Sequence, residues 1–158
     1  MDYLKSFGIT SGQGKYHQEN VYLLALTYNV LNAEISTYLK DFRLTPAKLN
    51  VLMTIRHQGG KEGISQVDIS KWLIVTPSNM TRLLDRLEKE GFIQRLAQKG
   101  DRRVNIIQIT TRGAQVLDRV WPGYLKILEK LSAGLKWNEQ RDLSLLMSRW
   151  LGILVNHQ

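Results

Sequence analysis

The stretch that decides the fold is ISQVDISKWLIVTPSNMTRLLDRLEKEGFIQR, residues 64–95. Ser65 is a typical helix N-cap, and the eight residues QVDISKWL after it predict a short helix. Thr76 and Pro77 predict the start of a second helix, because proline is favoured at the first helical position. Gly91 is expected to end that helix. Two helices joined by a short turn form a helix–turn–helix.

The second helix, residues 78–90, has two chemically different faces. Met80, Leu83, Leu84 and Leu87 form an apolar stripe that predicts a core-facing side. Its first turn has unpaired backbone N–H groups and the positive end of the helix dipole. Small polar side chains and arginines lie off the stripe, so the helix is suited to a DNA major groove. An ordinary capped amphipathic helix would explain the same pattern taken alone.

After this helix, residues 92–96 and 104–109 predict a β-hairpin whose tip is QKGDRR, residues 98–103. Gly100 and Asp101 suit a turn, and a solvated tip would account for some of the charge. A turn alone does not require four basic residues within nine positions, which here are Arg95, Lys99, Arg102 and Arg103. Arginine side chains favour the narrow, negative minor groove of DNA. Asp101 can hold one guanidinium in place by a bidentate pair.

Long helices are predicted on both sides of this segment. Upstream lie a helix over residues 19–41 with a wide apolar face, and a helix that begins at Thr45-Pro46 and ends before Gly59-Gly60. Downstream, a helix runs from Thr110 or Thr111 to about Leu131, with a kink expected at Pro122, and a last helix covers residues 139–155. Residues 1–18 predict a loose arm or a short irregular lead-in. The fold class is therefore mainly α with a small β-hairpin wing: a winged helix–turn–helix flanked by long helices.

Composition excludes several classes of function. The chain has 158 residues, no cysteine, and three histidines far apart in sequence, so disulfides, thiolate metal sites and a histidine metal cluster are not expected. We find no glycine-rich phosphate loop and no catalytic constellation, so we expect neither an enzyme nor a cofactor. The sequence has no apolar run long enough to span a bilayer and no signal-peptide core, which predicts a cytoplasmic protein without a membrane partner.

The formal net charge of +8 is unevenly distributed. Residues 1–44 carry four basic and four acidic side chains, residues 45–110 eleven and six, and residues 111–158 seven and four. The excess is therefore largest in the helix–turn–helix and hairpin. A basic surplus favours polyanionic partners such as nucleic acid.

With these elements in place, the sequence resembles the MarR family of bacterial transcriptional regulators. The resemblance covers LTPAKLNVL (44–52), residues 64–95 and DRRVNIIQITTRG (101–113). The last segment is similar to the wing signature of the family, whose positions here are Asp101, Arg103, Ile109, Thr110 and Gly113.

The resemblance implies a homodimer that binds a pseudo-palindromic double-stranded DNA operator. Residues 1–44 would hold an arm and the first dimerisation helix, residues 45–110 the winged helix–turn–helix, and residues 111–158 the C-terminal dimerisation helices. It also implies repression that is released by a small aromatic or phenolic effector. The lack of cysteine argues against a thiol-oxidation sensor, and the scattered histidines argue against a zinc sensor.

Carried over residue by residue, the resemblance assigns DNA binding to three groups. The recognition helix provides Thr76, Pro77, Ser78, Asn79, Thr81, Arg82 and Arg86; the preceding helix start provides Ser65 and Gln66; and the wing provides Lys99, Asp101, Arg102 and Arg103. Effector residues are not identified. Tyr28, Tyr38, His57 and Trp72 could edge a pocket, although core or interface packing is the favoured interpretation of each. The alternative function is a winged helix that serves only as a protein-interaction or scaffold module.

Overall fold

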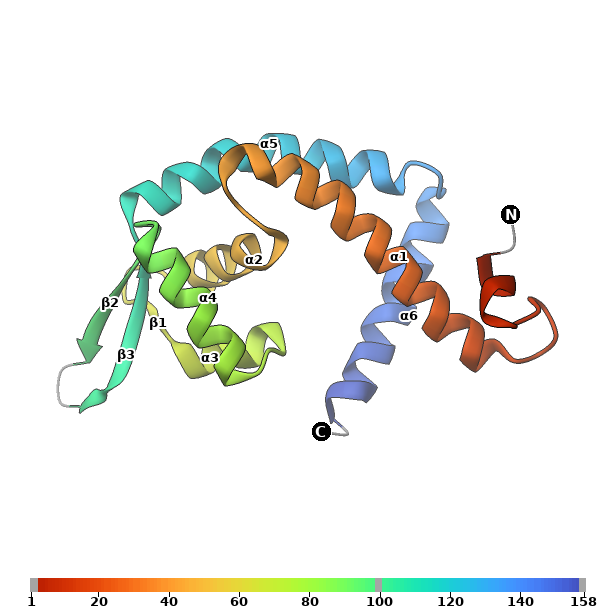
Figure 1. Ribbon diagram of the computed structural model, residues 1–158, viewed down its shortest axis with the longest axis horizontal. Coiled ribbons are helices and arrows are strands. Elements are labelled where there is room, and N and C mark those ends of the chain that lie inside the picture. The colour runs from red at the N-terminus through yellow and green to blue at the C-terminus, as the bar shows by residue number, and fades with distance from the viewer. Residues whose placement is uncertain (1–2, 99–100, 157–158) are drawn as a thin grey trace. The chain divides into compact units, whose positions relative to one another are not determined.

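The helix–turn–helix and the hairpin lie where the sequence predicts them (Figure 1). The computed structural model describes residues 3–98 and 101–156, and for residues 97, 98 and 101–105 it describes the backbone only. The elements in chain order are a 3₁₀ helix η1 (Tyr3–Phe7), α1 (Tyr16–Leu39), a 3₁₀ turn η2 (Lys40–Phe42), α2 (Pro46–Thr54), a π-helical turn η3 (Ile55–Gly59), β1 (Ile64–Ser65), α3 (Gln66–Leu73), α4 (Pro77–Lys89), β2 (Ile93–Gln98), β3 (Asp101–Ile109), α5 (Thr111–Ser132) and α6 (Trp137–Asn156).

The chain divides into two units, Met1–Pro122 and Gly123–Gln158. In the first unit the core lies where α2, α3 and α4 pack against one another. Leu52 of α2, Ile69 of α3, and Met80 and Leu84 of α4 are fully buried. Each such side chain contributes about 1.5–3 kcal/mol by leaving water, so this core fixes how the two helices of the helix–turn–helix are held.

The hairpin forms part of a three-stranded antiparallel sheet with the strand order β1-β3-β2. Ile107 of β3 pairs with Ile64 of β1 on one side and with Arg95 of β2 on the other. The predicted hairpin is therefore confirmed, and β3 is longer than expected. Strand β1 was not predicted, because a two-residue strand has no periodicity of its own and exists only through its pairing with β3.

The junction between β3 and α5 explains the threonine and glycine of the wing signature. The Thr110 hydroxyl donates to the Gly91 carbonyl at 2.7 Å and accepts the backbone N–H of Gly113 at 3.1 Å, which makes Thr110 the N-cap of α5. A Cβ atom at position 113 would lie 2.1 Å from the Phe92 carbonyl oxygen. Only glycine fits there, so the end of the wing and the start of α5 are tied to the end of the recognition helix.

The N-terminal lead-in is irregular, as one alternative predicted, but it is not loose. Leu4 and Ile9 are buried, and the Phe7 and Tyr22 rings lie 4.9 Å apart between centroids. The Gly12 N–H donates to the largely buried carboxylate of Glu19 at 3.1 Å. The prediction of a loose arm was wrong because apolar residues spaced along the segment pack against the start of α1, a signal that its glycine-rich composition obscured.

The second unit holds the end of α5 and all of α6. The carboxylate of Glu139 accepts the Lys136 N–H at 2.7 Å, and the side-chain amide of Gln140 donates to the Leu135 carbonyl at 2.9 Å, so α6 begins with its own polar contacts. None of the described residues of α6 is buried, although the helix carries eight large exposed hydrophobic side chains after its first residue. They are Leu143, Leu145, Leu146, Met147, Leu151, Ile153, Leu154 and Val155. Among the described residues, no helix combines the length and the apolar character that a membrane crossing would need.

Candidate nucleic-acid interface

The recognition helix α4 has the two faces that the sequence predicts. Met80, Leu84 and Leu87 are fully buried, and Leu83 is half-buried. The predicted contact residues of the same helix and its cap are all exposed: Thr76, Pro77, Ser78, Asn79, Thr81, Arg82 and Arg86. The helix is therefore anchored by one side and presents a continuous polar and basic side to solvent.

The start of α4 is open. Thr76 occupies the N-cap position with an extended backbone, but its hydroxyl makes no capping hydrogen bond and lies 3.5 Å from the Ser78 hydroxyl. Within the described residues, no side chain accepts a hydrogen bond from the first-turn N–H groups of α4. The predicted N-cap position is correct, while the capping bond is absent. Unpaired N–H groups at a helix start favour an anion such as a DNA phosphate.

The two helices of the motif meet through two of the predicted residues. The Gln66 side-chain amide donates to the Thr81 hydroxyl at 2.7 Å, and that hydroxyl donates to the Pro77 carbonyl at 3.0 Å. The structure therefore brings the α3 start and the α4 start together. This contact orients Gln66 beside the exposed face of α4.

Ser65 is already engaged in capping α3. Its hydroxyl accepts the Asp68 N–H at 3.1 Å and donates to the Asp68 carboxylate at 2.7 Å. This hydrogen bond, followed by one from Lys71, lowers the pKa of Asp68 below its usual value. The Ser65 hydroxyl must therefore share or exchange these bonds to contact a phosphate, and the phosphate contact stays a prediction.

Arg95 differs from the role that its place near the wing suggested. Its guanidinium pairs with the Asp85 carboxylate at 2.6 Å and with the Glu88 carboxylate, both on α4. Its backbone N–H also donates to Glu88 at 3.3 Å. Arg95 was counted with the wing cations, but its guanidinium is neutralised by these two carboxylates of the same chain. It fixes the base of β2 to the recognition helix, a role that depends on carboxylates seven and ten residues earlier.

The remaining wing residues lie at or beyond the limit of description. Lys99 lies outside the described residues. Asp101, Arg102 and Arg103 belong to β3 by their backbone, and their side chains, with the expected Asp101 pairing, lie outside the described part of the chain. Their DNA-binding roles stay predictions.

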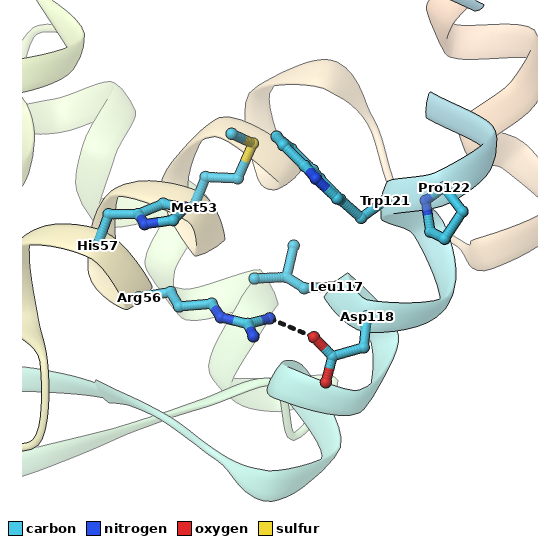
Figure 2. A pocket seen from close by; sticks show the side chains of 7 residues that line it. All are labelled: Met53, Arg56, His57, Leu117, Asp118, Trp121 and Pro122. Carbon is cyan, nitrogen blue, oxygen red and sulfur yellow. Dashed lines mark hydrogen bonds and ion pairs between the residues drawn. The ribbon is translucent and has the colours of Figure 1, made fainter. Parts of the chain in front are cut away.

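A separate hollow of about 260 Å³ lies between the end of α2 and α5 in the first unit (Figure 2). Its polar rim is formed by Arg56 and Asp118, paired at 2.6 Å, and by His57. Apolar walls complete it: Met53, Leu117, Trp121 and Pro122. Arg56, Asp118 and Trp121 were not predicted as site residues. The ion pair of Arg56 with Asp118 joins residues 62 positions apart, which leaves no local signal in the sequence.

The four aromatic and histidine residues considered for a ligand pocket lie in different environments. His57 lines the hollow of Figure 2 and, with Trp72, a shallower one of about 220 Å³. Tyr38 is half-buried, donates to the Val120 carbonyl at 2.8 Å, and has a pKa raised by burial. Tyr28 and Trp72 are about three-fifths exposed, which argues against core packing within the chain, and interface packing stays a prediction for both. Within the described residues, no cluster of three or more histidine, aspartate or glutamate side chains could hold a metal ion.

Comparison with known proteins identifies the family. The MarR family model matches residues 44–104. YfiV of Bacillus subtilis, an uncharacterized HTH-type transcriptional regulator, is 32% identical over 130 residues, which cover 80% of this chain and 78% of that protein. The chain belongs to the MarR family. It is a DNA-binding transcriptional regulator with a winged helix–turn–helix fold, as the sequence predicts.

Two further comparisons support this assignment. The regulator PecS of Dickeya dadantii is 27% identical over 129 residues, covering 82% of this chain and 78% of that protein. A variant of E. coli MarR in a crystal with operator DNA superposes with a TM-score of 0.80 and 25% identity, covering 89% of this chain and 99% of that one. These MarR-family relatives are transcriptional regulators and not enzymes, which confirms that prediction.

Proposed function

We propose that the chain acts as a homodimeric repressor in the cytoplasm, bound to a pseudo-palindromic operator and released by a small aromatic or phenolic ligand. The observation that carries the DNA-binding part is the two-sided helix α4. Its exposed polar face, with an open N-terminus and the arginines Arg82 and Arg86, lies opposite a stripe in which Met80, Leu84 and Leu87 are fully buried. In this proposal α4 enters the major groove and the wing residues Lys99, Asp101, Arg102 and Arg103 reach the flanking minor groove.

The apolar surfaces outside the first unit's core support a homodimer. Helix α6 carries large exposed side chains along its whole length and has no buried residue among those described. The first half of α1 likewise exposes Val21, Tyr22, Leu23 and Leu24. A second copy that covered either face would complete a core, and a large exposed apolar face of this kind marks an interface. Residues 1–44 and 111–158 are accordingly assigned to dimerisation and residues 45–110 to DNA binding.

The hollow of Figure 2 is proposed as the effector site. It combines an apolar floor with a guanidinium and an imidazole, a combination that favours an aromatic ring bearing an anionic or phenolic oxygen. Such an oxygen can replace the Asp118 carboxylate as the partner of Arg56. The pair joins the turn after α2 to α5, so its opening would alter how the winged helix is held and shift the population of recognition-helix spacings.

The test of the proposed function is selection of bound duplexes from a random DNA pool, followed by affinity measurement at two salt concentrations. We expect an enriched inverted repeat with half-sites about one helical turn apart and a steep loss of affinity with salt. Arg82→Ala and Arg103→Ala are each expected to weaken operator binding by about 1–3 kcal/mol. If no sequence is enriched and affinity does not depend on salt, the scaffold alternative replaces this function.

A further inference from the structure

A second hollow of the first unit, of about 300 Å³, is rich in arginine. Arg43, at the end of η2, and Arg112 and Arg119, on α5, line it together with a single acidic residue, Asp41. We call it the arginine pocket. Arg112 and Arg119 are seven residues apart, which places them two turns apart on one face of α5. Three positive charges against one negative charge make this a strongly cationic concavity.

The guanidinium groups of the arginine pocket have no carboxylate partner within the described residues. Among the other arginines of the first unit whose side chains are described, Arg56 and Arg95 form ion pairs, whereas Arg82 and Arg86 are unpaired on the exposed face of α4. Unpaired arginines thus occur in two places. Arg43, Arg112 and Arg119 are likewise exposed, but they lie outside the operator contacts proposed for α4. Three like charges around one hollow that holds a single acidic residue raise the local positive potential and attract an anion.

The Arg112 side chain and the Arg43 backbone each have a described contact. The Arg112 guanidinium lies 5.3 Å from the centroid of the Phe92 ring, a cation–π contact. Arg43 has a left-handed backbone, φ 57° and ψ 28°, in which its N–H donates to the Lys40 carbonyl at 3.0 Å. This left-handed backbone conformation is strained for a residue that carries a Cβ atom. Arg112 also lies in the first turn of α5, where the helix dipole opposes a cation and favours an anion.

We propose that the arginine pocket binds a small phosphoryl anion, at a site separate from the DNA interface. Guanidinium groups bind phosphate oxygens through paired hydrogen bonds, and three of them can serve the three terminal oxygens of one phosphoryl group. The Phe92 ring is 3% exposed and is covered by Arg112, so no open ring face is available there for a nucleobase. Recognition therefore rests on the phosphoryl group. The bound anion bridges the α1–α2 junction and the start of α5, and so stabilises the winged helix.

The first arm of the test measures binding to the full chain by calorimetry at constant ionic strength, with pyrophosphate, glycerol 3-phosphate and citrate as separate probes. We expect pyrophosphate or the phosphate ester to bind, and Arg43→Gln and Arg119→Gln each to weaken that binding by about tenfold or more. Tighter binding of pyrophosphate identifies an inorganic source, and tighter binding of the ester identifies a metabolite. Lys61→Gln removes one exposed charge elsewhere in the unit and should leave the affinity unchanged.

The second arm separates the proposal from an extended DNA contact. Operator affinity is measured for the same variants at several salt concentrations without added anion. We expect Arg119→Gln to keep the wild-type affinity and salt dependence. A salt slope reduced by about one would show that the arginine contacts the DNA backbone, and the proposal would be wrong. It would also be wrong if neither phosphoryl probe binds, if citrate binds as tightly as they do, or if Lys61→Gln weakens binding as much as Arg119→Gln.

Discussion

Helices α3 and α4 are neighbours in one motif, yet they begin in opposite ways and end on different types of residue. Helix α3 begins closed, because Ser65 and Asp68 satisfy each other across its first turn. Helix α4 begins open, because the Thr76 hydroxyl does not cap it. At the other end, α3 stops on Ile74, which has a left-handed backbone with φ 51°. Helix α4 stops before Gly91, which adopts φ 76° without steric strain because glycine has no Cβ atom.

This difference suits the two helices to different roles: α3 to positioning the motif, and α4 to contacting a partner. At the closed start of α3 the polar groups bond to one another and stabilise the helix, so α3 serves as a fixed support. The open start of α4 leaves N–H groups and hydroxyls for a partner, so part of the stability of the helix must come from its buried stripe and from Arg95 and Lys48. The Lys48 ammonium lies 2.6 Å from the Glu90 carboxylate and ties the end of α4 to α2.

The largest effects are expected where the two helices are alike, in the core. Ile69→Ala in α3 and Leu84→Ala in α4 each remove a fully buried side chain, and each should lower the free energy of unfolding by about 2–5 kcal/mol. Urea unfolding at one fixed protein concentration measures both, since association would otherwise shift the midpoint. A much smaller cost at Leu84 than at Ile69 would show that the stripe does not anchor α4.

The helix starts provide the next contrast. Ser65→Ala breaks a cap and should lower the free energy of unfolding by about 0.5–2 kcal/mol. Thr76→Ala breaks no capping bond, so its effect on unfolding should stay within about 0.5 kcal/mol while operator affinity falls. The same urea series and an operator titration measure the pair. An equal loss of stability at both positions would mean that the two helix starts are not different.

Much of this motif could be predicted from the sequence because its determinants are local. The caps at Thr45 and Ser65, the stop at Gly91 and the apolar stripe of α4 each depend on residues within a few positions of one another, and all lie as predicted. What could not be predicted depends on distant partners. Arg95 resembles the wing cations in sequence, and only the fold brings it to Asp85 and Glu88.

Three other features of the structure could not be predicted from local sequence either. The ion pair of Arg56 with Asp118 joins segments with no recognisable relation in sequence, and the arginine pocket gathers residues from η2 and α5. The Thr76 position predicts a cap, but whether a hydroxyl turns towards its own helix depends on a rotamer that the sequence does not specify.

The helix ends give a pair of opposite substitutions. Ile74→Gly relieves a left-handed β-branched residue at a cost in unfolded-state entropy, so the net gain in stability should be about 0.5–1 kcal/mol. Gly91→Ala places the same strain at the end of α4, where a Cβ would meet only Arg112 atoms at 3.8 Å, and should lower stability by about 1–2 kcal/mol. Thermal and urea unfolding of both variants tests the contrast. A loss of stability in Ile74→Gly would mean that the isoleucine side chain contributes more through packing than its conformation costs.

The smallest expected effect is a pH dependence at the closed start of α3. The Ser65 hydrogen bond, and then Lys71, lower the pKa of Asp68 in the folded protein below its unfolded value of about 3.9. A folded pKa below the unfolded one means that the stabilisation is fully present above the unfolded value and is lost as pH falls through the folded value. The pH window therefore lies below about 4 and leaves neutral pH untouched.

Carboxyl chemical shifts of Asp68 followed by NMR across this window test the assignment directly. We expect Ser65→Ala to raise the pKa of Asp68 towards its ordinary value by more than Lys71→Gln does, because the serine bond is the larger cause. Asp68→Asn should match the wild type in stability at the lowest pH and fall below it as pH rises. If the pKa of Asp68 stays at its ordinary value in the wild type, the first turn of α3 is not closed in solution, and α3 and α4 begin alike.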